Sequence, residues 1–247
     1  MVLVMEFLFP KFPRTKHLPH KPNATSSDKI ATEEECACIF SSTNVEFTEK
    51  IDGSNTAIIW KNSNLIISNR NNILNKGYNR EDTSAKAQYR PIWNWAYEHI
   101  ENFEKLENLL GFCPVIYGEW LYARHTIKYD QLPSFFIFFD IYNGKDFIHS
   151  GIARDSLAKS GFDIVPLIKT GKISSYGELD NWIRQKSIFS STDMMEGIYI
   201  KIFDSEKITN RFKIVRKDFI QGEHWTKSAL IKNQLKNQMK IFTTDDL

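Results

Sequence analysis

The stretch Glu49-Lys50-Ile51-Asp52-Gly53-Ser54-Asn55 decides how the rest of the chain is interpreted. Residues 45–48 alternate apolar and polar side chains as a strand does, and residues 56–60 are rich in β-branched and aromatic side chains. Lys50 therefore lies where one strand ends, and Gly53 gives the following turn a permissive backbone. A lysine amine attacks as a nucleophile only when it is neutral, so a catalytic Lys50 needs neighbouring cations or burial to lower its pKa. The alternative is a surface lysine before a hairpin turn.

The composition is that of an ordinary globular protein, with 247 residues of which 42% are hydrophobic and 25% are charged. A net charge of +2 and a pI near 8.3 are mild for a nucleic-acid binder, which often exceeds a pI of about 9, but they leave room for a local phosphate-binding groove. Cys36, Cys38 and Cys113 are an odd number without metal-ligand spacing, which indicates a reducing compartment. No apolar run is long enough to span a membrane, so we expect a cytoplasmic protein.

The N-terminal part of the chain combines an apolar start with a basic, proline-rich segment. Residues 1–9 are expected to form a strand that Pro10 ends, rather than a signal peptide. Residues 11–22 are expected to be extended and irregular, either as an arm over a phosphate site or as a solvated loop. Residues 32–35 have the capping residue and early acids of a helix start.

Hydrophobic periodicity predicts the remaining elements. After the strand at 56–60, a turn-rich connection at 61–64 predicts a hairpin that places Arg70 near the pocket of Lys50, and the polar residues 71–87 predict a mobile loop. Helices are expected at residues 92–110 (stopped by Gly111), 152–159, 174–188 and 224–240, and strands at residues 114–117, 134–142, 164–168, 198–203 and 211–216. The almost wholly apolar run at 134–142 is expected to be a central strand. With no repeat and no linker, the predicted fold is a single α+β domain of antiparallel β-sheets with flanking helices.

The strand-end residues, taken in order, resemble the covalent nucleotidyltransferase superfamily of ATP-dependent RNA and DNA ligases and mRNA capping enzymes. The matching segments are the nucleophile stretch 50–55, Arg70, Gly118-Glu119, Phe138-Phe139-Asp140-Ile141, Glu196-Gly197 and Lys213. Six matches in one order over most of the chain are far more specific than any one of them.

Within that superfamily, the Glu49-Lys50 pair and the Phe-Asp-Ile strand look most like the RNA ligase 2 type. Residues 13–19, residues 118–125 and the Lys-x-Val-Arg segment followed by His224-Trp225 are similar to a bacterial and phage group of RNA ligase domain proteins. That family usually has Lys-x-Lys in its fifth motif. Here Val215 takes the second position, so Arg211 or Arg216 supplies that cation, or the cation is absent.

The resemblance implies one adenylyltransferase domain over residues 1–247 without an OB domain. An N-terminal strand and basic arm would occupy residues 1–44, the five motifs residues 45–219 and a helical tail residues 220–247. In the implied reaction, neutral Lys50 attacks the α-phosphorus of ATP to give lysyl-AMP, AMP moves to a 5′-phosphate on RNA, and a 3′-hydroxyl displaces it to form a phosphoric-ester bond, as in RNA repair. Lys213 would stabilise charge at the α-phosphate and lower the pKa of Lys50 by repulsion. The implied enzyme is a monomer.

The resemblance also implies a role for each strand-end residue. Glu196 would coordinate Mg²⁺ or Mn²⁺, and Glu119 would hold the ribose hydroxyls. Phe139 would stack on adenine, and Glu49 would accept a hydrogen bond from its exocyclic amine. The alternatives are solvated strand ends for Glu119 and Glu196, and a core position for Phe139.

The resemblance implies further residues of the site. Asn55 would belong to the ATP site, Arg70 would hold ribose or phosphate oxygens, and Asp52 would either orient Lys50 or bind a second-shell water. The candidate residues for the RNA 5′-phosphate are Arg14, His17, Arg124, His125 and Arg216.

Two rival functions stay open at this point. A DNA nick ligase or other polynucleotide nucleotidyltransferase would share the motifs, although such enzymes usually carry an OB-type domain and here only a short tail follows Phe219. A non-catalytic nucleotide- or RNA-binding module would lack the nucleophile or the metal ligand, and both Lys50 and Glu196 are present.

Overall fold

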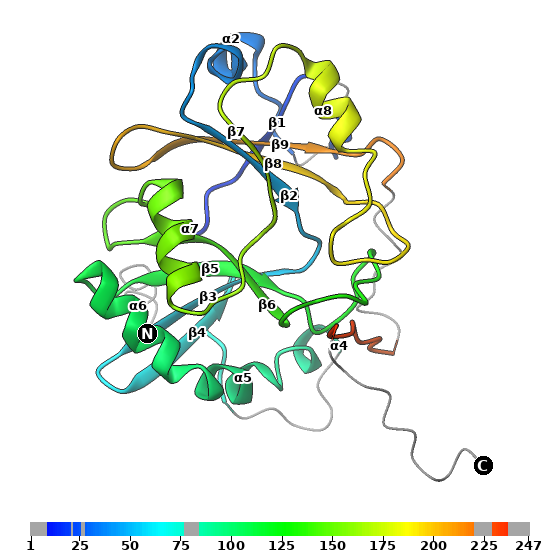
Figure 1. Ribbon diagram of the computed structural model, residues 1–247. Helices are drawn as coiled ribbons and strands as arrows, with labels where there is room; N and C mark the ends of the chain where they lie inside the picture. The colour runs from blue at the N-terminus through cyan, green and yellow to red at the C-terminus, as the bar shows by residue number, and fades with distance from the viewer. Residues whose placement is uncertain (1–8, 21, 26–27, 77–83, 220–228, 237–247) are drawn as a thin grey trace.

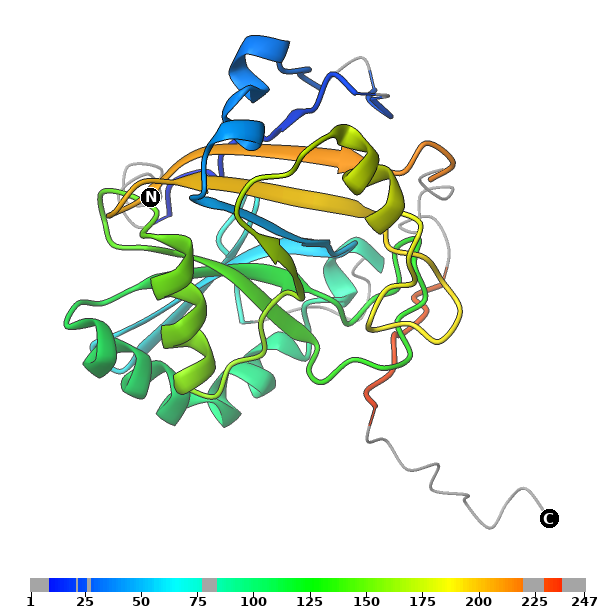
Figure 2. The same cartoon turned by 45° about the horizontal axis from the view of Figure 1, so that its top comes forward.

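The computed structural model describes residues 9–20, 22–25, 28–76, 84–219 and 229–236. Two β-sheets stack at the centre, and helices cover their outer sides (Figure 1). Helices α2 and α8 lie outside one sheet, and α5 and α6 lie outside the other, as the tilted view also shows (Figure 2). The described residues therefore form the predicted α+β architecture, and they contain no OB barrel.

The five-stranded sheet has the order β1-β9-β8-β2-β7. Its strands are β1 (Lys16–His17), β2 (Val45–Lys50), β7 (Leu167–Thr170), β8 (Gly197–Phe203) and β9 (Ile208–Val215). Strand β8 is antiparallel to both β2 and β9, with Gly197 opposite Lys50 on one side and opposite Val215 on the other. This register places the last residue of β2 and the first residue of β8 side by side at the same end of the sheet.

The four-stranded sheet has the order β4-β3-β5-β6 and is antiparallel throughout. Its strands are β3 (Ser54–Lys61), β4 (Asn64–Asn69), β5 (Val115–Trp120) and β6 (Phe136–Tyr142). The predicted hairpin joins β3 to β4, and Asn62 and Ser63 take its two positive φ angles, 50° and 59°. Asn55 on β3 pairs with Glu119 on β5, so two candidate site residues lie side by side.

Seven helices are assigned in the described residues. They are α2 (Glu33–Cys36), α3 (Cys38–Ser41), α4 (Ser84–Ala87), α5 (Ile92–Glu98), α6 (Ile100–Leu110), α7 (Ser150–Lys159) and α8 (Tyr176–Trp182). The predicted start of α2 is confirmed, because Thr32 and Glu35 form a capping box. Gly111 ends α6 in the left-handed conformation, as predicted.

Apolar clusters lie on both sides of each sheet. Phe136, Phe138 and Trp120 of the four-stranded sheet pack against α5, α6 and α7. Phe47 and Ile200 of the five-stranded sheet pack against α2, α3 and α8. A smaller cluster includes Leu121 and Ile137 together with Ile51, so it anchors the stretch 49–55 through Ile51.

Two helix predictions were wrong in extent. The periodic stretch 92–110 is broken at His99, whose backbone (φ −112°) leaves the helical range and whose ring nitrogen is 2.6 Å from the carbonyl of Trp95. The helix predicted at 174–188 covers only Tyr176–Trp182. Residues 185–195 instead make a loop, held by bonds such as Ser187 N to Asp193 O.

Two strand predictions were also wrong. Strand β6 is not central but lies at the edge of its sheet. It is buried because α7 packs on it and a bridge from Phe138 to Ile164 covers its free edge. The strand predicted at 164–168 is β7, which begins later, at Leu167, because residues 163–165 make that bridge instead.

The C-terminal helix predicted at 224–240 is wrong where the chain is described. Residues 229–236 contain no helix and bridge to Ala123 and Leu132. The buried amide of Asn233 donates to the carbonyl of Leu121 at 2.8 Å and accepts from the amide of Tyr129 at 3.0 Å, so tertiary hydrogen bonds replace helical ones. The strand predicted at 1–9 (apart from Phe9), His224-Trp225 and residues 77–83 of the loop predicted at 71–87 lie outside the described residues. The loop prediction is wrong at its end, where residues 84–87 form α4.

Candidate nucleotide-binding site

Lys50 is held by a glutamate from the neighbouring strand. Its Nζ lies 2.6 Å from both carboxylate oxygens of Glu196. The β2–β8 register explains this contact, since Lys50 pairs with Gly197, the residue after Glu196. The Lys50 side chain is 24% exposed, so it is reachable from solvent.

The predicted lowering of the Lys50 pKa is wrong for this ligand-free arrangement. Burial lowers the pKa of the Lys50 ammonium, but the charge and hydrogen bond of Glu196, together with the charges of Glu119 and Asp52, raise the pKa above its ordinary value overall. Lys213 does not offset them, because its Nζ donates to Asp28 at 2.9 Å. Lys50 is therefore a protonated amine here.

Three glutamates near the lysine have abnormally high pKa values. Burial raises the pKa of Glu49 and of Glu196 to about 7, and that of Glu119 to about 8. One carboxylate oxygen each of Glu49 and Glu119 is buried and has no hydrogen-bond partner in the described part of the chain. Buried acceptors without donors suit a ligand that brings its own donors.

A narrow, mostly apolar pocket beside Lys50 contains the two residues predicted to bind adenine. Both Glu49 and Phe139 line it. The lining residues are Phe12, Thr48, Glu49, Lys50, Ile51, Asn55, Glu119, Phe139, Val165 and Tyr199. A flat aromatic ring beside a carboxylate acceptor suits a planar base with an exocyclic amine.

A larger cleft of about 640 Å³ adjoins this pocket and also has Lys50 in its lining. Its lining includes the candidate residues His17, Lys50, Asp52, Asn55, Arg70, Glu119, His125, Glu196 and Lys213. The structure thus brings together side chains from five strands (β1, β2, β3, β5 and β9) and four connecting segments that are far apart in the sequence. Arg70 faces the same cleft as Lys50, as predicted.

The five candidates for RNA binding do not converge. His17 and His125 line the cleft of Lys50, whereas Arg14 lines a neighbouring cavity. Burial lowers the pKa of His17 and of His125, so neither imidazole is a full cation at neutral pH. Arg124 and Arg216 line neither cavity.

Neither candidate replaces the missing fifth-motif lysine inside the cleft. Arg211 pairs with buried Asp140 at 3.0 Å and lies over the Phe147 ring. Arg216 has its Nη1 3.4 Å from Asp218, and its main-chain amide donates to the carbonyl of Glu196. Lys213 is therefore the one fifth-motif cation among the described residues that lines the cleft.

Asp52 positions a loop. Its Oδ2 accepts hydrogen bonds from the amides of Thr126 at 2.8 Å and Ile127 at 3.1 Å. The loop after β5 thereby brings His125 within 4.0 Å of Asp52 and into the cleft.

The sequence interpretation missed Phe12, Asp28 and Tyr199. Phe12 stands between two prolines in the basic arm, and its ring lies 5.3 Å from that of Phe139. A large aromatic residue in a polar arm is a signal that was available. No sequence signal pointed to Asp28, because its partner Lys213 is 185 residues away in the chain.

The donor set fits a hard divalent cation that keeps most of its own water. In the described part of the chain, no group of three or more His, Cys, Asp or Glu side chains is arranged to hold a metal ion. Glu196 faces the cleft with Asp52 and Glu119 near it, and all their donor atoms are carboxylate oxygens. Carboxylates together with substrate phosphates are the usual magnesium environment.

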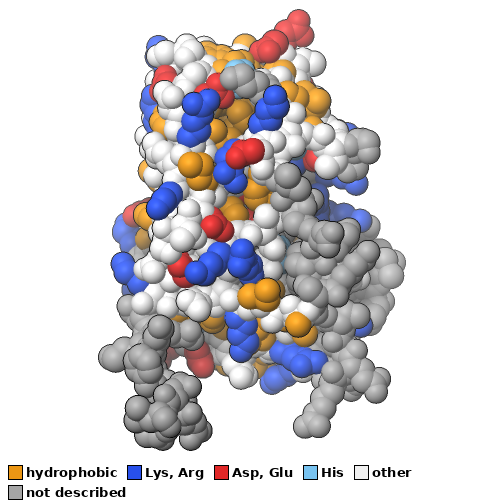
Figure 3. Space-filling view, turned by 90° about the vertical axis from the view of Figure 1, so that its right-hand side faces the viewer, with side chains coloured by type: hydrophobic (Ala, Val, Ile, Leu, Met, Phe, Trp, Pro, Cys, Tyr) orange, Lys and Arg blue, Asp and Glu red, His pale blue; other side chains and the backbone are white. Residues whose placement is uncertain are grey.

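The surface agrees with the mild net charge. On the side of the molecule shown in Figure 3, lysine and arginine side chains stand in small groups among acidic and polar ones. No helix within the described residues is long and apolar enough to cross a membrane.

Two stacked, mostly antiparallel sheets place Lys50 against Glu196 at a strand end, and solved structures share this fold. The Naegleria gruberi RNA ligase with PPi superposes with a TM-score of 0.54 at 19% identity, covering 86% of this chain and 64% of that one. A variant of that ligase with ATP and Mn gives 0.54 at 18% identity over 83% and 60%, and another with ATP and Mn gives 0.50 at 20% over 70% and 50%.

The family follows from the sequence comparison. The model of the RNA ligase family matches residues 43–215, so the chain belongs to the RNA ligase family. The chain spans from half to 64% of the length of the ligase structures described above. A search of the curated proteins found no match.

Proposed function

We propose that this protein is an ATP-dependent RNA ligase that uses Lys50 as its nucleophile. The observation that carries the proposal is the position of Lys50, within 2.6 Å of Glu196, where a pocket that suits adenine meets a polar cleft. Membership of the RNA ligase family supports the same reaction.

The first step joins AMP to the lysine. A bond forms between Lys50 Nζ and the α-phosphorus of ATP, the bond to the bridging oxygen breaks, and pyrophosphate leaves with the electron pair. Because Glu196 holds Lys50 as an ammonium, Lys50 attacks only after Glu196 turns to another partner and the ammonium gives its proton to solvent water. A divalent cation would be held by Glu196, and it supplies charge neutralisation at the phosphate oxygens.

The second and third steps transfer AMP and join the ends. An oxygen of the RNA 5′-phosphate attacks the α-phosphorus and breaks the lysine–phosphorus bond, which restores Lys50. The 3′-hydroxyl of the other end then attacks the 5′-phosphorus, loses its proton to solvent, forms the phosphoric-ester bond and expels AMP. Lys213 would stabilise charge that develops on the phosphates once it is released from Asp28.

The pocket residues orient the nucleoside. Phe139 would stack on adenine, and Glu49, whose Oε1 is buried without a partner, would accept from the exocyclic amine. Asn55 and Glu119 are paired on neighbouring strands at the ribose end, and Arg70 faces the phosphates from the cleft. We infer a role in RNA repair inside the cell from this chemistry.

A panel of nicked substrates tests the proposal. Strands with labelled 5′-phosphates are offered with ATP and Mg²⁺ as nicked RNA duplex, single-stranded RNA and nicked DNA duplex. We expect joining of RNA ends and little joining of DNA ends. Joining of DNA ends alone would support the DNA ligase interpretation instead, and lysine labelling without joining of any substrate would leave only the nucleotidyltransferase step.

A further inference from the structure

A second cavity, of about 340 Å³, adjoins the cleft beyond Lys213. Its walls come from the N-terminal arm, the loop before α2 and the end of β4. The lining residues are Lys11, Phe12, Arg14, Thr15, Asp28, Lys29, Arg70, Asn71 and Lys213. Five of these side chains are cations and one is an acid, a far stronger bias than the net charge of +2 over the whole chain.

The positive charge in this cavity is largely uncompensated. The acid, Asp28, already binds Lys213 at 2.9 Å and the Thr25 hydroxyl at 2.8 Å. The other four cations make no ion pair with any carboxylate in the described ranges. Like charges gathered in one hollow repel each other, so a polyanion that enters relieves a repulsion present in the ligand-free protein.

The cavity adjoins the cleft at Lys213 and does not include Lys50 in its lining. It shares Asp28, Arg70, Asn71 and Lys213 with the cleft, whereas Lys50 lines the cleft and the narrow pocket but not this cavity. A phosphoryl transfer in line requires the leaving group to depart on the side of the phosphorus opposite the attacking atom. An α-phosphate between Lys50 and Lys213 would therefore direct its leaving group into this cavity.

We propose that the cavity binds the β- and γ-phosphates of ATP and then the departing pyrophosphate, with Lys11, Arg14 and Lys29 as binding residues. This inference rests on the proposed function, because it concerns the leaving group of the first step. It gives the N-terminal arm a role in the ATP reaction rather than in holding RNA.

The arm is fixed firmly enough for that role. The Tyr117 hydroxyl donates to the carbonyl of Pro10 at 2.7 Å, and the Thr15 hydroxyl lies 2.6 Å from that of Tyr199. The Leu18 amide donates to the carbonyl of Lys213 at 2.9 Å. The arm thus crosses between the two sheets while anchored to both, so its cations are largely positioned before a ligand arrives.

Asp28 allows a test in which one substitution should strengthen pyrophosphate binding and another should weaken it. Its carboxylate competes with an incoming phosphate for Lys213, so Asp28→Asn should strengthen pyrophosphate binding, whereas loss of the arm cations should weaken it. Asparagine keeps an oxygen that can accept from Thr25, so the loop is preserved. A change that merely damaged the fold would not improve binding.

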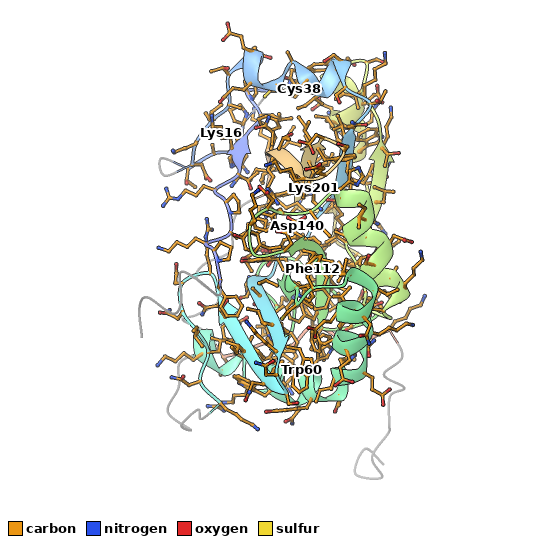
Figure 4. The ribbon with its side chains drawn as sticks, turned by 90° about the vertical axis from the view of Figure 1, so that its left-hand side faces the viewer. Lys16, Cys38, Trp60, Phe112, Asp140 and Lys201 are labelled. Carbon is orange, nitrogen blue, oxygen red and sulfur yellow. The ribbon has the colours of Figure 1, made fainter. Side chains whose placement is uncertain are left out.

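Isothermal titration calorimetry of pyrophosphate with Mg²⁺ into the ATP-free protein measures this directly. In the Lys11→Ala/Arg14→Ala double variant we expect the dissociation constant to rise about tenfold or more, and in Asp28→Asn we expect it to fall several-fold. Lys16→Ala is the matched control, because Lys16 lies on the same arm but pairs with Glu35 outside this cavity (Figure 4). Its dissociation constant should equal that of the wild type.

A second assay separates this cavity from an RNA site. RNA that already carries a 5′-adenylate is joined without ATP, so the double variant should join it at the wild-type rate while forming lysyl-AMP with a raised KM for ATP. No measurable pyrophosphate binding by the wild type, equal binding by the double variant, or a defect confined to joining adenylylated RNA would each overturn the proposal. If the wild type forms no lysyl adduct at all, the proposed function fails instead, and the calorimetry still reports on the cavity.

Discussion

At the scale of single residues, the proposed nucleophile Lys50 is held in its protonated form in the ligand-free protein. Lys50 lies between carboxylates that raise its pKa, and the carboxylates are themselves buried enough to have raised pKa values. Because the pKa values of Lys50 and of these carboxylates depend on each other, a ligand that binds one of the groups changes the protonation of the others. The ligand-free protein therefore keeps a charged pair where the reaction needs a free amine.

Glu49 should make the ligand-free protein less stable as pH rises. Burial raises its pKa to about 7 from an ordinary value near 4.5, so the folded protein binds more protons than the unfolded chain between these values. Stability is then greatest below pH 4.5 for this group and declines until about pH 7. Glu49→Gln removes the penalty and should gain up to about 3 kcal/mol over the wild type above pH 7, with no gain at pH 4.5.

Urea unfolding of both proteins from pH 4.5 to pH 8 checks this expectation. Glu178→Gln is the control, because a hydrogen bond from Lys169 lowers the pKa of that exposed carboxyl, so its loss brings no gain at high pH. An equal stability difference between Glu49→Gln and the wild type at every pH would show that Glu49 has an ordinary pKa.

The sequence motifs predicted which residues line the cleft and the narrow pocket, but they did not predict the protonation state of Lys50. Lys50 ends β2, Glu119 is next to last in β5 and Glu196 directly precedes β8, and such strand ends were predicted from alternating runs and turns, whereas Phe139 lies in the middle of β6. The raised pKa of Lys50 was not visible, because it depends on distances of a few ångströms between residues separated by 146 positions.

At the scale of elements, two glycines allow the strands that carry the acidic residues to approach their neighbours. A Cβ at Gly118 would meet the carbonyl oxygen of Ile137 at 2.5 Å, and a Cβ at Gly197 would meet that of Ile214 at 2.1 Å. Each glycine is next to a site glutamate, Glu119 or Glu196. Close strand approach thus sets where these carboxylates stand.

Gly197→Ala should force β8 away from β9 and move Glu196 from Lys50. We expect a loss of about 2 kcal/mol or more in unfolding free energy and a marked fall in lysine labelling by ATP. Gly177→Ala in α8 is the control, since its Cβ would meet nothing closer than 3.3 Å, a side-chain oxygen of Ser175. Wild-type stability and labelling in Gly197→Ala would contradict the argument.

The prediction of helices and strands failed where contacts between distant residues determined the structure more strongly than the local hydrophobic periodicity. The apolar run of β6 was correctly judged to be buried, but burial came from α7 and a bridge to Ile164 rather than from strands on both sides. The segment 229–236 has a polar, helix-compatible sequence, yet the hydrogen bonds of Asn233 hold it extended against residues 121–132. No periodicity encodes either contact.

At the scale of the whole molecule, a buried charge network joins the two sheets. Lys201 of β8 is fully buried and lies 2.9 Å from Asp140 of β6 and 3.2 Å from Glu46 of β2 (Figure 4). Its Nζ also donates to the carbonyl of Phe139 at 2.7 Å. The same lysine therefore holds the sheets together and fixes the backbone at Phe139, which lines the narrow pocket beside Lys50.

Lys201→Met should cost about 3 kcal/mol or more, because it leaves two buried carboxylates short of a cation. Lys207→Met is the control, since Lys207 pairs with Asp146 at the surface and should cost less than about 1 kcal/mol. Urea unfolding of both variants measures the difference. Equal effects would mean that the buried network contributes no more than a surface pair.

The central claim is that Lys50 carries the AMP group, and peptide mapping after incubation with α-labelled ATP and Mg²⁺ tests it most directly. Lys61→Arg, at the exposed end of β3, serves as the matched control and should label like the wild type. We predict a single AMP on Lys50 in the wild type and none in Lys50→Arg, because arginine stays protonated and cannot attack. Label on another residue of the wild type, or any label on Lys50→Arg, would contradict the account.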